Sequence, residues 1–500
     1  MIKFKVFALS NYGLLSFVLG CCVALGQAPW ALTTIAVVSL LILFYVISYQ
    51  KIIRHEKIIF MFGLGYFSLS LHWIMEPFFV EGESYIWIAP FAFLALVFFC
   101  SSFWTFSTYL ILKISRSKST LTVALALLVG EVIRSYCFSG FPWGLIGYIW
   151  TDTPIALLSA WVGPIGLTGM TFILTALPFS KINNIRPALS SLIIFLVLLS
   201  VTYFQLKTSD RLFSTKIVRL VQPNAVQEKK WDPLYSPIYF EVLLDLTSSG
   251  EKATVDLIIW PESAIVPFLD DATEEFKKIG ENMPPDSELI LGIRRQNKNN
   301  IYNSLVLLNN DGLVSGSYDK FHLVPFGEYI PILRYLEKLG LIFTENFSNI
   351  GFSAGNGVAV LSSKIGLFRP LICYEAIFFQ EIYHESRPEF IVNITNDAWL
   401  GDWAGPSQHL QQVKMRAIEQ GLPVIRSANT GISAIVNPYG ETIASIGLGL
   451  RGYVDVLLPL KVKKTFYSLT GERVNFFIIF IWFFMIFFRR KKIVIDDTYH

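Results

Sequence analysis

Charged residues are scarce in this 500-residue sequence. Asp, Glu, Lys and Arg make up 16% of it, whereas apolar residues make up 53% and the mean hydropathy is +0.51. An ordinary soluble domain has about 25% charged residues. The scarcity is uneven: residues 1–206 hold 17 of the charged side chains, residues 207–472 hold 55 and residues 473–500 hold 7. A chain with this many apolar residues is not disordered. The composition of its first two-fifths also excludes an ordinary soluble protein.

Cysteine is scarce as well. Four of the five cysteines, Cys21, Cys22, Cys100 and Cys137, lie in apolar segments, and Cys373 is the only one in the charged middle region. A lone thiol there has no partner for a disulfide, so it is either buried or reactive. The cysteines and the 6 histidines show no zinc-type spacing, and the net charge of +3 comes without a basic stripe. We therefore expect no metal, no cofactor and no nucleic-acid partner.

Long apolar runs are abundant, and they predict membrane-spanning helices. A helix needs about 20 apolar residues to cross a bilayer. Eight spans are predicted, near residues 7–25, 31–49, 58–75, 87–112, 120–136, 155–179, 187–206 and 474–488. The apolar stretch 139–150 is short and broken by Gly and Pro, which favours an interfacial or re-entrant segment. A cleaved signal peptide over residues 1–28 is the alternative for the first span, but further spans follow directly and favour a retained helix.

Loop charges orient the predicted helices, because basic residues gather on the cytoplasmic side of membrane proteins. With eight spans, every basic cluster falls on one side: Lys3 and Lys5, Lys51 to Lys57, Lys113 to Lys118, Lys181 and Arg186, and Arg489 to Lys492. Both termini are therefore predicted to be cytoplasmic. Residues 1–206 hold the first seven spans, residues 207–472 form a domain on the outer, periplasmic side of the cytoplasmic membrane, and residues 473–500 form the last span and a basic tail.

Glu131 and Arg134 are ionisable residues inside the fifth predicted span. Their i, i+3 spacing puts them on one face of a helix. Ionisable groups at that depth are costly and are usually functional or paired. Two interpretations stay open: an ion pair within or between helices, or a site that binds a lipid headgroup.

Residues 207–472 change to short β-rich runs that alternate with turns and helices. The predicted strands cover residues 217–221, 257–260, 289–293, 304–308, 370–373, 390–394 and 432–436, and the predicted helices cover 236–246 and 408–420. This alternation predicts layered α/β structure with at least one sheet. The chain is thus expected to combine an α-helical transmembrane bundle with an α/β domain.

Three residues close to the ends of predicted strands form a candidate catalytic set. Glu262 follows strand 257–260, Lys320 comes after strand 304–308, and Cys373 closes strand 370–373. A thiol is a useful nucleophile when it is ionised, and a nearby carboxylate can accept its proton. A lysine ammonium can stabilise both a thiolate and a developing oxyanion. The three residues together suffice for acyl transfer through a thioester. Each alone is a weak signal, because a single cysteine is most often buried in a core and a single glutamate or lysine is usually solvated.

The sequence around these residues resembles the carbon–nitrogen hydrolase (nitrilase) superfamily. Glu262 lies in WPES, Lys320 in YDKFHLVPFGE and Cys373 in CYE, in that order, and NITNDAW (393–399) and RSANTGISAIVNPYGE (426–441) continue the match. The resemblance covers roughly residues 217–460. It implies an αββα sandwich with a Glu-Lys-Cys triad.

The whole chain resembles the apolipoprotein N-acyltransferase family of bacterial cytoplasmic membranes. This match includes QPNAVQEKKWDP (222–233), HLVPFGEYIP (322–331) and NDAWLGDWAGPSQHLQQVKMRAIEQG (396–421), with GEVIRSYCFSGFPWG (130–144) in and after the fifth span. The resemblance implies Cys373 as the nucleophile, Glu262 as the general base and Lys320 as the oxyanion stabiliser.

The same resemblance implies supporting residues. Glu328 matches a second glutamate that orients the site, and Tyr374 and Glu375 follow the nucleophile. The backbone N–H of Tyr374 is a candidate second oxyanion donor, since such donors often flank nucleophiles. Trp231 and Trp399 match aromatic residues that are expected near the entrance for lipid substrates.

The implied reaction has two half-steps and two membrane-held substrates. Cys373 takes an acyl chain from the sn-1 ester of a phospholipid, expected to be phosphatidylethanolamine, and passes it to the α-amine of a diacylglyceryl-cysteine lipoprotein. A site that handles two such substrates benefits from tethering to the bilayer. Because water has to be kept from the thioester, the apolar segment 330–352 is expected to be a mobile loop near the membrane, with ordinary packing as the alternative.

Two other functions stay open. A membrane-anchored amidase or nitrilase would share the triad and release its product to water. A catalytically inactive scaffold or transporter would need neither acyl donor nor acceptor, but the presence of all three catalytic residue types and the lack of repeated broken spans count against it.

Overall fold

The computed structural model describes residues 12–49, 54–80, 83–115, 118–181, 184–250, 255–331 and 351–496. The chain divides into two compact units. Residues 1–209 and 465–500 form the first unit, and residues 210–464 form the second. The first unit is helical where it is described, and the second holds both β-sheets.

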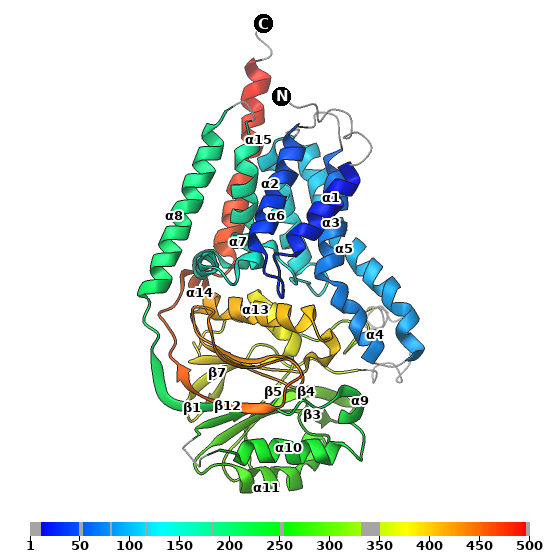
Figure 1. The fold of residues 1–500 in the computed structure, drawn as a ribbon, viewed down its shortest axis with the longest axis vertical. Coiled ribbons are helices and arrows are strands. Elements are labelled where there is room, and N and C mark those ends of the chain that lie inside the picture. Colours follow the sequence, from blue (N-terminus) through cyan, green and yellow to red (C-terminus); the bar gives the residue numbers. More distant parts are fainter. Residues whose placement is uncertain are drawn as a thin grey trace. The chain divides into compact units, whose positions relative to one another are not determined.

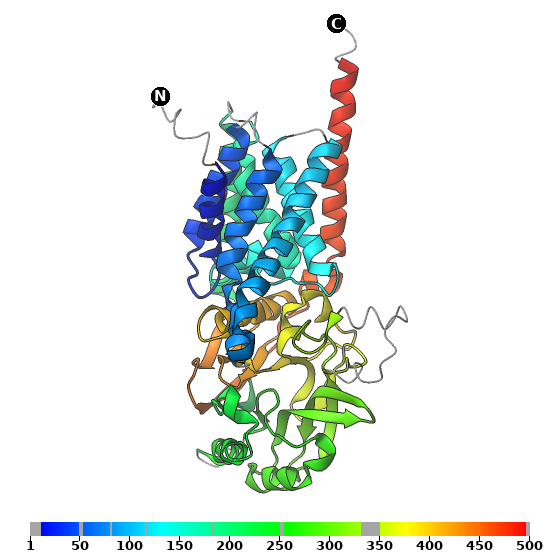
Figure 2. The same ribbon diagram turned by 90° about the vertical axis from the view of Figure 1, so that its right-hand side faces the viewer.

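The first unit is a bundle in which a helix occupies each of the eight segments expected to span a membrane (Figures 1 and 2). These helices are α1 (Tyr12–Ala24), α2 (Thr33–Tyr49), α3 (His55–Ser70), α5 (Ala89–Ser115), α6 (Thr120–Tyr136), α7 (Ser159–Ala176), α8 (Arg186–Thr208) and α15 (Arg473–Asp496). The C-terminal α15 returns to the bundle, where Ile479 and Trp482 pack against buried Ile111 and Leu125 of α5 and α6.

Fewer of these helices qualify as membrane spans by length and hydropathy than the eight predicted. Within the described residues, three do, at Tyr85–Ser115, Pro154–Phe179 and Arg186–Thr208, and a fourth results if α3 and the bent segment His72–Val80 form one broken span. The apolar parts of α1, α2 and α15 have 10–17 residues, fewer than the roughly 20 that cross a bilayer core. The helix α6 has 17 residues and contains two charged ones.

Glu131 and Arg134 form a buried ion pair on α6, which is one of the two interpretations left open by the sequence. Arg134 Nη1 also donates hydrogen bonds to the carbonyls of Phe141 and Trp143, at 2.5 and 2.7 Å. These carbonyls belong to the irregular stretch 139–150, which ends in the buried 3-10 helix η3 (Ile146–Trp150). The Arg134 guanidinium thus donates hydrogen bonds to two backbone carbonyls. In a regular helix such carbonyls would accept hydrogen bonds from the backbone N–H groups of the helix itself.

The second unit contains two six-stranded sheets. The first has the order β12–β1–β2–β3–β4–β5, with β1 (Phe213–Gln222), β2 (Leu257–Ile259), β3 (Glu288–Asn297), β4 (Asn300–Leu308), β5 (Val314–Asp319) and β12 (Gly452–Pro459). The second has the order β11–β10–β9–β8–β7–β6, with β6 (Leu361–Ser363), β7 (Gly366–Ile372), β8 (Phe390–Thr395), β9 (Val424–Ala428), β10 (Ser433–Val436) and β11 (Thr442–Ile446). The strands β1, β2 and β3 are parallel, as are β7, β8 and β9.

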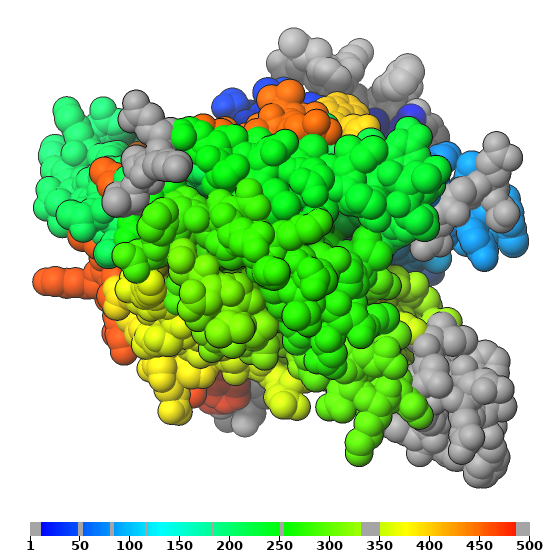
Figure 3. All heavy atoms as spheres, turned by 90° about the horizontal axis from the view of Figure 1, so that it is seen from below, coloured from blue at the N-terminus to red at the C-terminus, as the bar shows by residue number. Residues whose placement is uncertain are grey.

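The two sheets pack face to face, and helices cover their outer faces. Residues of both sheets, such as Leu220 and Leu257 from the first and Ile372 and Ile394 from the second, share one buried cluster. The outer face of the first sheet packs against α10 (Ser236–Ser248) and α11 (Thr273–Asn282), which form much of the surface in Figure 3. The outer face of the second packs against α13 (Ala404–Gln420). The predicted αββα sandwich is confirmed.

Candidate active site

Glu262 follows β2, whose three residues are buried between the neighbouring parallel strands. Its buried carboxylate accepts hydrogen bonds from Nδ2 of Asn303 on β4 and from the backbone N–H of Asn396 after β8, both at 2.7 Å. A Cβ atom at position 292 would meet the Cα atom of Glu262 at 2.6 Å, so Gly292 permits a close approach of the two backbones. Residues of both sheets therefore hold this carboxylate in place.

Lys320 directly follows β5, a strand that the sequence did not predict. Its backbone N–H donates to the carbonyl of Asn303 at 2.8 Å. Its ammonium group is 1% exposed and donates to Glu328 at 2.9 Å. Glu328 also accepts hydrogen bonds from Asn303 Nδ2 at 3.2 Å and from the backbone N–H of Val324 at 2.8 Å. Asn303 thus connects the carboxylate of Glu262 with the one that holds the lysine.

Cys373 is the first residue of the 3-10 helix η7 (Cys373–Ile377). The strand β7 ends at Ile372, one residue before the predicted end at Cys373. Its φ of +52° lies in the left-handed region, which costs a residue with a Cβ atom about 1–2 kcal/mol. The side chain is half-buried. Because β7 runs parallel to β8, Cys373 and Asn396 emerge at the same edge of the second sheet. Such backbone strain is often found at functional positions.

The charges of these three side chains act on one another. Burial and the Glu262 carboxylate raise the pKa of Cys373 to about 12, against the opposing effect of Lys320. Burial also raises the pKa of Glu262, and Lys320 opposes this rise. Burial lowers the pKa of Lys320, but Glu328, Cys373 and Glu262 more than compensate, so that it is raised. The structure thus brings the three predicted residues together as a resting thiol, a carboxylate and an ammonium group.

Glu375 connects the turn that carries Cys373 to the loop that carries Lys320. Its buried carboxylate accepts hydrogen bonds from the hydroxyl of Tyr318 and the backbone N–H of Phe321, both at 2.7 Å, through Oε1. Through Oε2 it accepts one from the backbone N–H of Ile372, also at 2.7 Å. Tyr374, beside it, is half-buried, and its ring lies 5.0 Å from that of Phe378 between centroids.

The two predicted tryptophans lie on different segments near the site. Trp231 is 37% exposed, and the Arg294 guanidinium lies 4.4 Å from the centre of its ring. Trp399 is half-buried in η9 (Asp397–Leu400), two residues after Asp397. Of the predicted loop 330–352, residues 332–350 lie outside the described residues.

Sequence reasoning missed several polar residues that contact Glu262. Asn303 and Asn396 are two of them. Lys230, at the end of α9 (Gln227–Lys230), is buried and donates from Nζ to the backbone carbonyl of Glu262 at 3.1 Å. Burial lowers the pKa of Lys230 to about 8. The only signal in the sequence that could have identified them is a polar residue at a position where an apolar one is expected. Asn303, within the largely buried strand β4, is an example.

Comparisons with known proteins cover both units. The carbon–nitrogen hydrolase family model matches residues 218–462, and the model of the apolipoprotein N-acyltransferase N-terminal domain matches residues 19–177. Among curated relatives, the apolipoprotein N-acyltransferase of Brucella suis is 34% identical over 91% of both chains. That of Rhodopseudomonas palustris is 35% identical over 82% of this chain and 81% of its own. With this identity over most of its length, the chain belongs to the apolipoprotein N-acyltransferase family and is a membrane-bound acyltransferase.

Proposed function

We propose that Cys373 carries a fatty acyl chain as a thioester from a phospholipid to the N-terminal amine of a diacylglyceryl-cysteine apolipoprotein. The observation that carries this proposal is the grouping of a half-buried thiol with a buried carboxylate and a buried ammonium. A thiol whose pKa is raised to about 12 is protonated at neutral pH. It therefore needs an adjacent base to become a nucleophile.

In the first half-step, Cys373 Sγ attacks the sn-1 ester carbonyl of the phospholipid, with phosphatidylethanolamine as the expected donor. Glu262 accepts the thiol proton as the S–C bond forms. The Lys320 ammonium stabilises the negative charge that develops on the carbonyl oxygen. When the C–O bond breaks, Glu262 returns the proton to the leaving alkoxide, so that a lysophospholipid leaves and an acyl-thioester stays on Cys373.

In the second half-step, the α-amine of the lipoprotein attacks the thioester carbonyl. Glu262 accepts a proton from the amine, and when the C–S bond breaks it gives this proton to the thiolate of Cys373. The product is an amide, and the enzyme returns to its starting state. Lys320 serves both half-steps, because both pass through an oxyanion at the same carbonyl position.

Other residues support this chemistry in the proposal. Glu328 holds Lys320, and the backbone N–H of Tyr374 is a second donor to the oxyanion. Glu375 fixes the relative position of Cys373 and Lys320 through its four hydrogen bonds. Trp231 and Trp399 contact the lipid substrates at the entrance to the site.

Membrane placement is part of the same proposal. In this proposal the shorter apolar helices cross the cytoplasmic membrane together with the three or four that meet the length and hydropathy criteria. Both termini are cytoplasmic, and the αββα domain within 207–472 lies on the outer side. The charge pattern of the loops supports this orientation. It would put the thiol on the side where the acceptor lipoproteins are exposed.

The decisive experiment is mass spectrometry of the purified protein after exposure to phosphatidylethanolamine vesicles. We expect an acyl adduct on the peptide that contains Cys373 and an equal amount of lysophospholipid. Addition of a diacylglyceryl-cysteine peptide should then remove the adduct and yield the N-acylated peptide. Release of free fatty acid, with no transfer to the peptide amine, would instead identify a hydrolase.

A further inference from the structure

A buried polar network lies behind the nucleophile, and the mechanism above does not use it. Its members are Asp397 in η9, His409 on α13 and Arg426 on β9, each at most 1% exposed. Asp397 Oδ2 accepts a hydrogen bond from Arg426 Nη2 at 2.5 Å. His409 Nδ1 lies 3.0 Å from Asp397 Oδ1 and 3.1 Å from Arg426 Nη2. An anion and a cation thus fix one edge of the imidazole ring.

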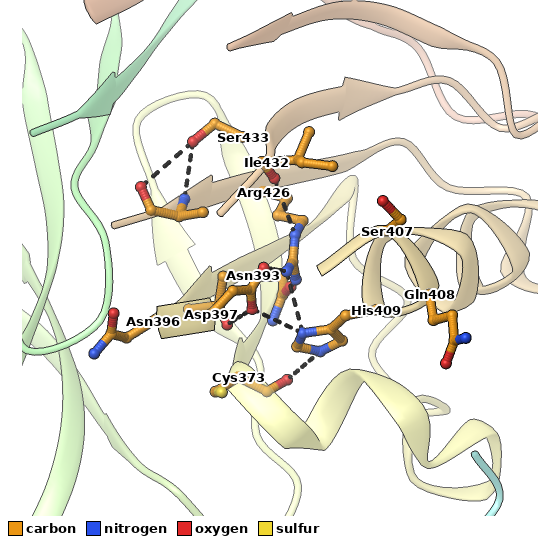
Figure 4. A network of polar contacts seen from close by, with 12 residues as sticks. Cys373, Asn393, Asn396, Asp397, Ser407, Gln408, His409, Arg426, Ile432 and Ser433 are labelled. Carbon is orange, nitrogen blue, oxygen red and sulfur yellow. Dashed lines mark hydrogen bonds and ion pairs between the residues drawn. The ribbon is translucent and has the colours of Figure 1, made fainter. Parts of the chain in front are cut away.

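The other edge of this ring faces the nucleophile. His409 Nε2 lies 3.1 Å from the backbone carbonyl of Cys373, as Figure 4 shows. Because a carbonyl oxygen can only accept, Nε2 is protonated and donates in either charge state of the ring. Thr395 adds a further contact to the carboxylate, since its hydroxyl donates to Asp397 Oδ1 at 2.9 Å.

The carbonyl that His409 contacts belongs to the residue with the strained backbone. The φ of +52° at Cys373 is a backbone conformation that residues with a Cβ atom rarely adopt. Such a conformation persists only when its surroundings hold it in place. Among the side-chain hydrogen bonds of the described residues, the one from His409 Nε2 is made directly to this carbonyl.

We propose that His409 is a positioning residue for the nucleophile. Its Nε2–H bond holds the Cys373 carbonyl, and thereby keeps the thiol aimed at the substrate, while Asp397 and Arg426 hold the ring. This inference rests on the proposed role of Cys373 as the nucleophile. The site is closely fitted: a Cβ atom at position 431 would lie 2.3 Å from Asp397 Oδ2, so Gly431 leaves the room that the carboxylate occupies.

Two variants of similar polarity separate positioning from a structural role. In His409→Gln, the terminal amide nitrogen reaches about as far as Nε2 and can still donate to the Cys373 carbonyl. In His409→Asn, the amide reaches only as far as Nδ1, so it keeps the contacts with Asp397 and Arg426 but not the bond to Cys373. The full-length proteins are purified in detergent with His384→Gln as a control on a loop of the same unit. Their single-turnover acylation of Cys373 by phosphatidylethanolamine is followed by mass spectrometry.

We expect His409→Gln to acylate within about fivefold of the wild type and His409→Asn to be slowed by about 50-fold or more, since small misplacements of a reacting group cost about 100-fold. Because His409→Asn keeps the contacts with Asp397 and Arg426, it should be no less stable to thermal unfolding than His409→Gln, so its slower acylation does not result from unfolding. Equal rates for the two variants, whether both fast or both slow, would overturn the inference.

Alkylation of the Cys373 peptide by iodoacetamide, compared between the same proteins, needs no acyl donor. It should be slower in His409→Asn than in His409→Gln, and equal alkylation rates would also overturn the inference. Failure of the wild type to become acylated, with this difference in alkylation preserved, would count against the proposed function and not against the positioning role.

Discussion

The side chains of Glu262, Lys320 and Cys373 each depend on their neighbours for a usable protonation state. Burial favours the neutral form of all three groups. Lys320 opposes the rise in the pKa of both Glu262 and Cys373, whereas Glu328 and Glu262 keep Lys320 charged. A change in one residue is therefore expected to alter the other two.

The first prediction concerns this interdependence. Glu262→Gln removes the proton acceptor, and Lys320→Met removes the positive charge near the oxyanion. Each is expected to cost roughly 3–6 kcal/mol of transition-state stabilisation, measured as the loss in kcat/KM for acyl transfer. The double variant should lose much less than the sum, because the residues act as one unit. Additive losses in kcat/KM would contradict the view that the two residues act as one unit. Glu241→Gln, on α10 and outside the site, is the control and should leave kcat/KM unchanged.

The second prediction concerns pH and Lys230. Glu262 has to be ionised to accept the thiol proton, and burial raises its pKa above the usual 4.5, while Lys320, Asn303 and Lys230 oppose the rise and Glu328 adds to it. kcat/KM should therefore fall as the pH falls through a pKa above 4.5. Lys230→Met removes a nearby positive charge, which should move this acid limb to higher pH.

The neighbouring lysine supplies the control for this experiment. Lys229 is exposed, with its ammonium 4.8 Å from the Tyr235 ring centre. Lys229→Met should leave the pH profile unchanged. An acid limb at the same pH in Lys230→Met and in the wild type would show that Lys230 does not act on Glu262.

At the scale of elements, the site depends on strand ends from two different sheets. Glu262 and Lys320 come from the first sheet, and Cys373 and Asn396 come from the second. The link between β5 and β7 is the buried carboxylate of Glu375. Loss of this link should shift the ammonium group relative to the thiol.

The third prediction tests this link. Glu375→Gln replaces one accepting oxygen by a donor, so at least one buried N–H or O–H loses its partner. The expected cost is about 1–3 kcal/mol in the free energy of unfolding, together with slower acylation of Cys373. Thermal unfolding and single-turnover acylation measure the two effects. Glu381→Gln, which changes a half-buried carboxylate beside His322, is the matched control, and equal behaviour of the two variants would argue against the link.

At the scale of the whole molecule, the proposed orientation places the αββα unit on the outer side of the membrane. The fourth prediction is that a thiol introduced by Lys278→Cys, exposed on α11, reacts with an impermeant maleimide in intact spheroplasts. The background carries Cys137→Ser and Cys373→Ser. A thiol at the exposed position 118, introduced by Lys118→Cys, should react only after permeabilisation. The reverse pattern would place the αββα unit in the cytoplasm.

Local patterns of apolar residues predicted much of the fold. Particular strands and helices show which parts these patterns did not predict. The predicted strands correspond to β1, β2, β3, β4, β7, β8 and β10. Five of the described strands were missed: β5, β6, β9, β11 and β12. Of these, β5 (VSGSYD) and β6 (LSS) are short or polar and owe their conformation to pairing with β4 and β7. The count of eight spans rested on apolar runs, whereas three or four described helices meet the length and hydropathy that crossing requires.

The sequence by itself determined the chemical groups, the order in which they occur and the family, because those depend on local motifs and on similarity along the chain. Only the tertiary structure decided which groups meet. Asn303 joins two carboxylates that are 66 residues apart in sequence, and His409 reaches the carbonyl of Cys373 across 36 residues. Contacts of this kind arise because strands that are distant in sequence pair within one sheet and because α13 packs on the second sheet. No periodicity or composition encodes them.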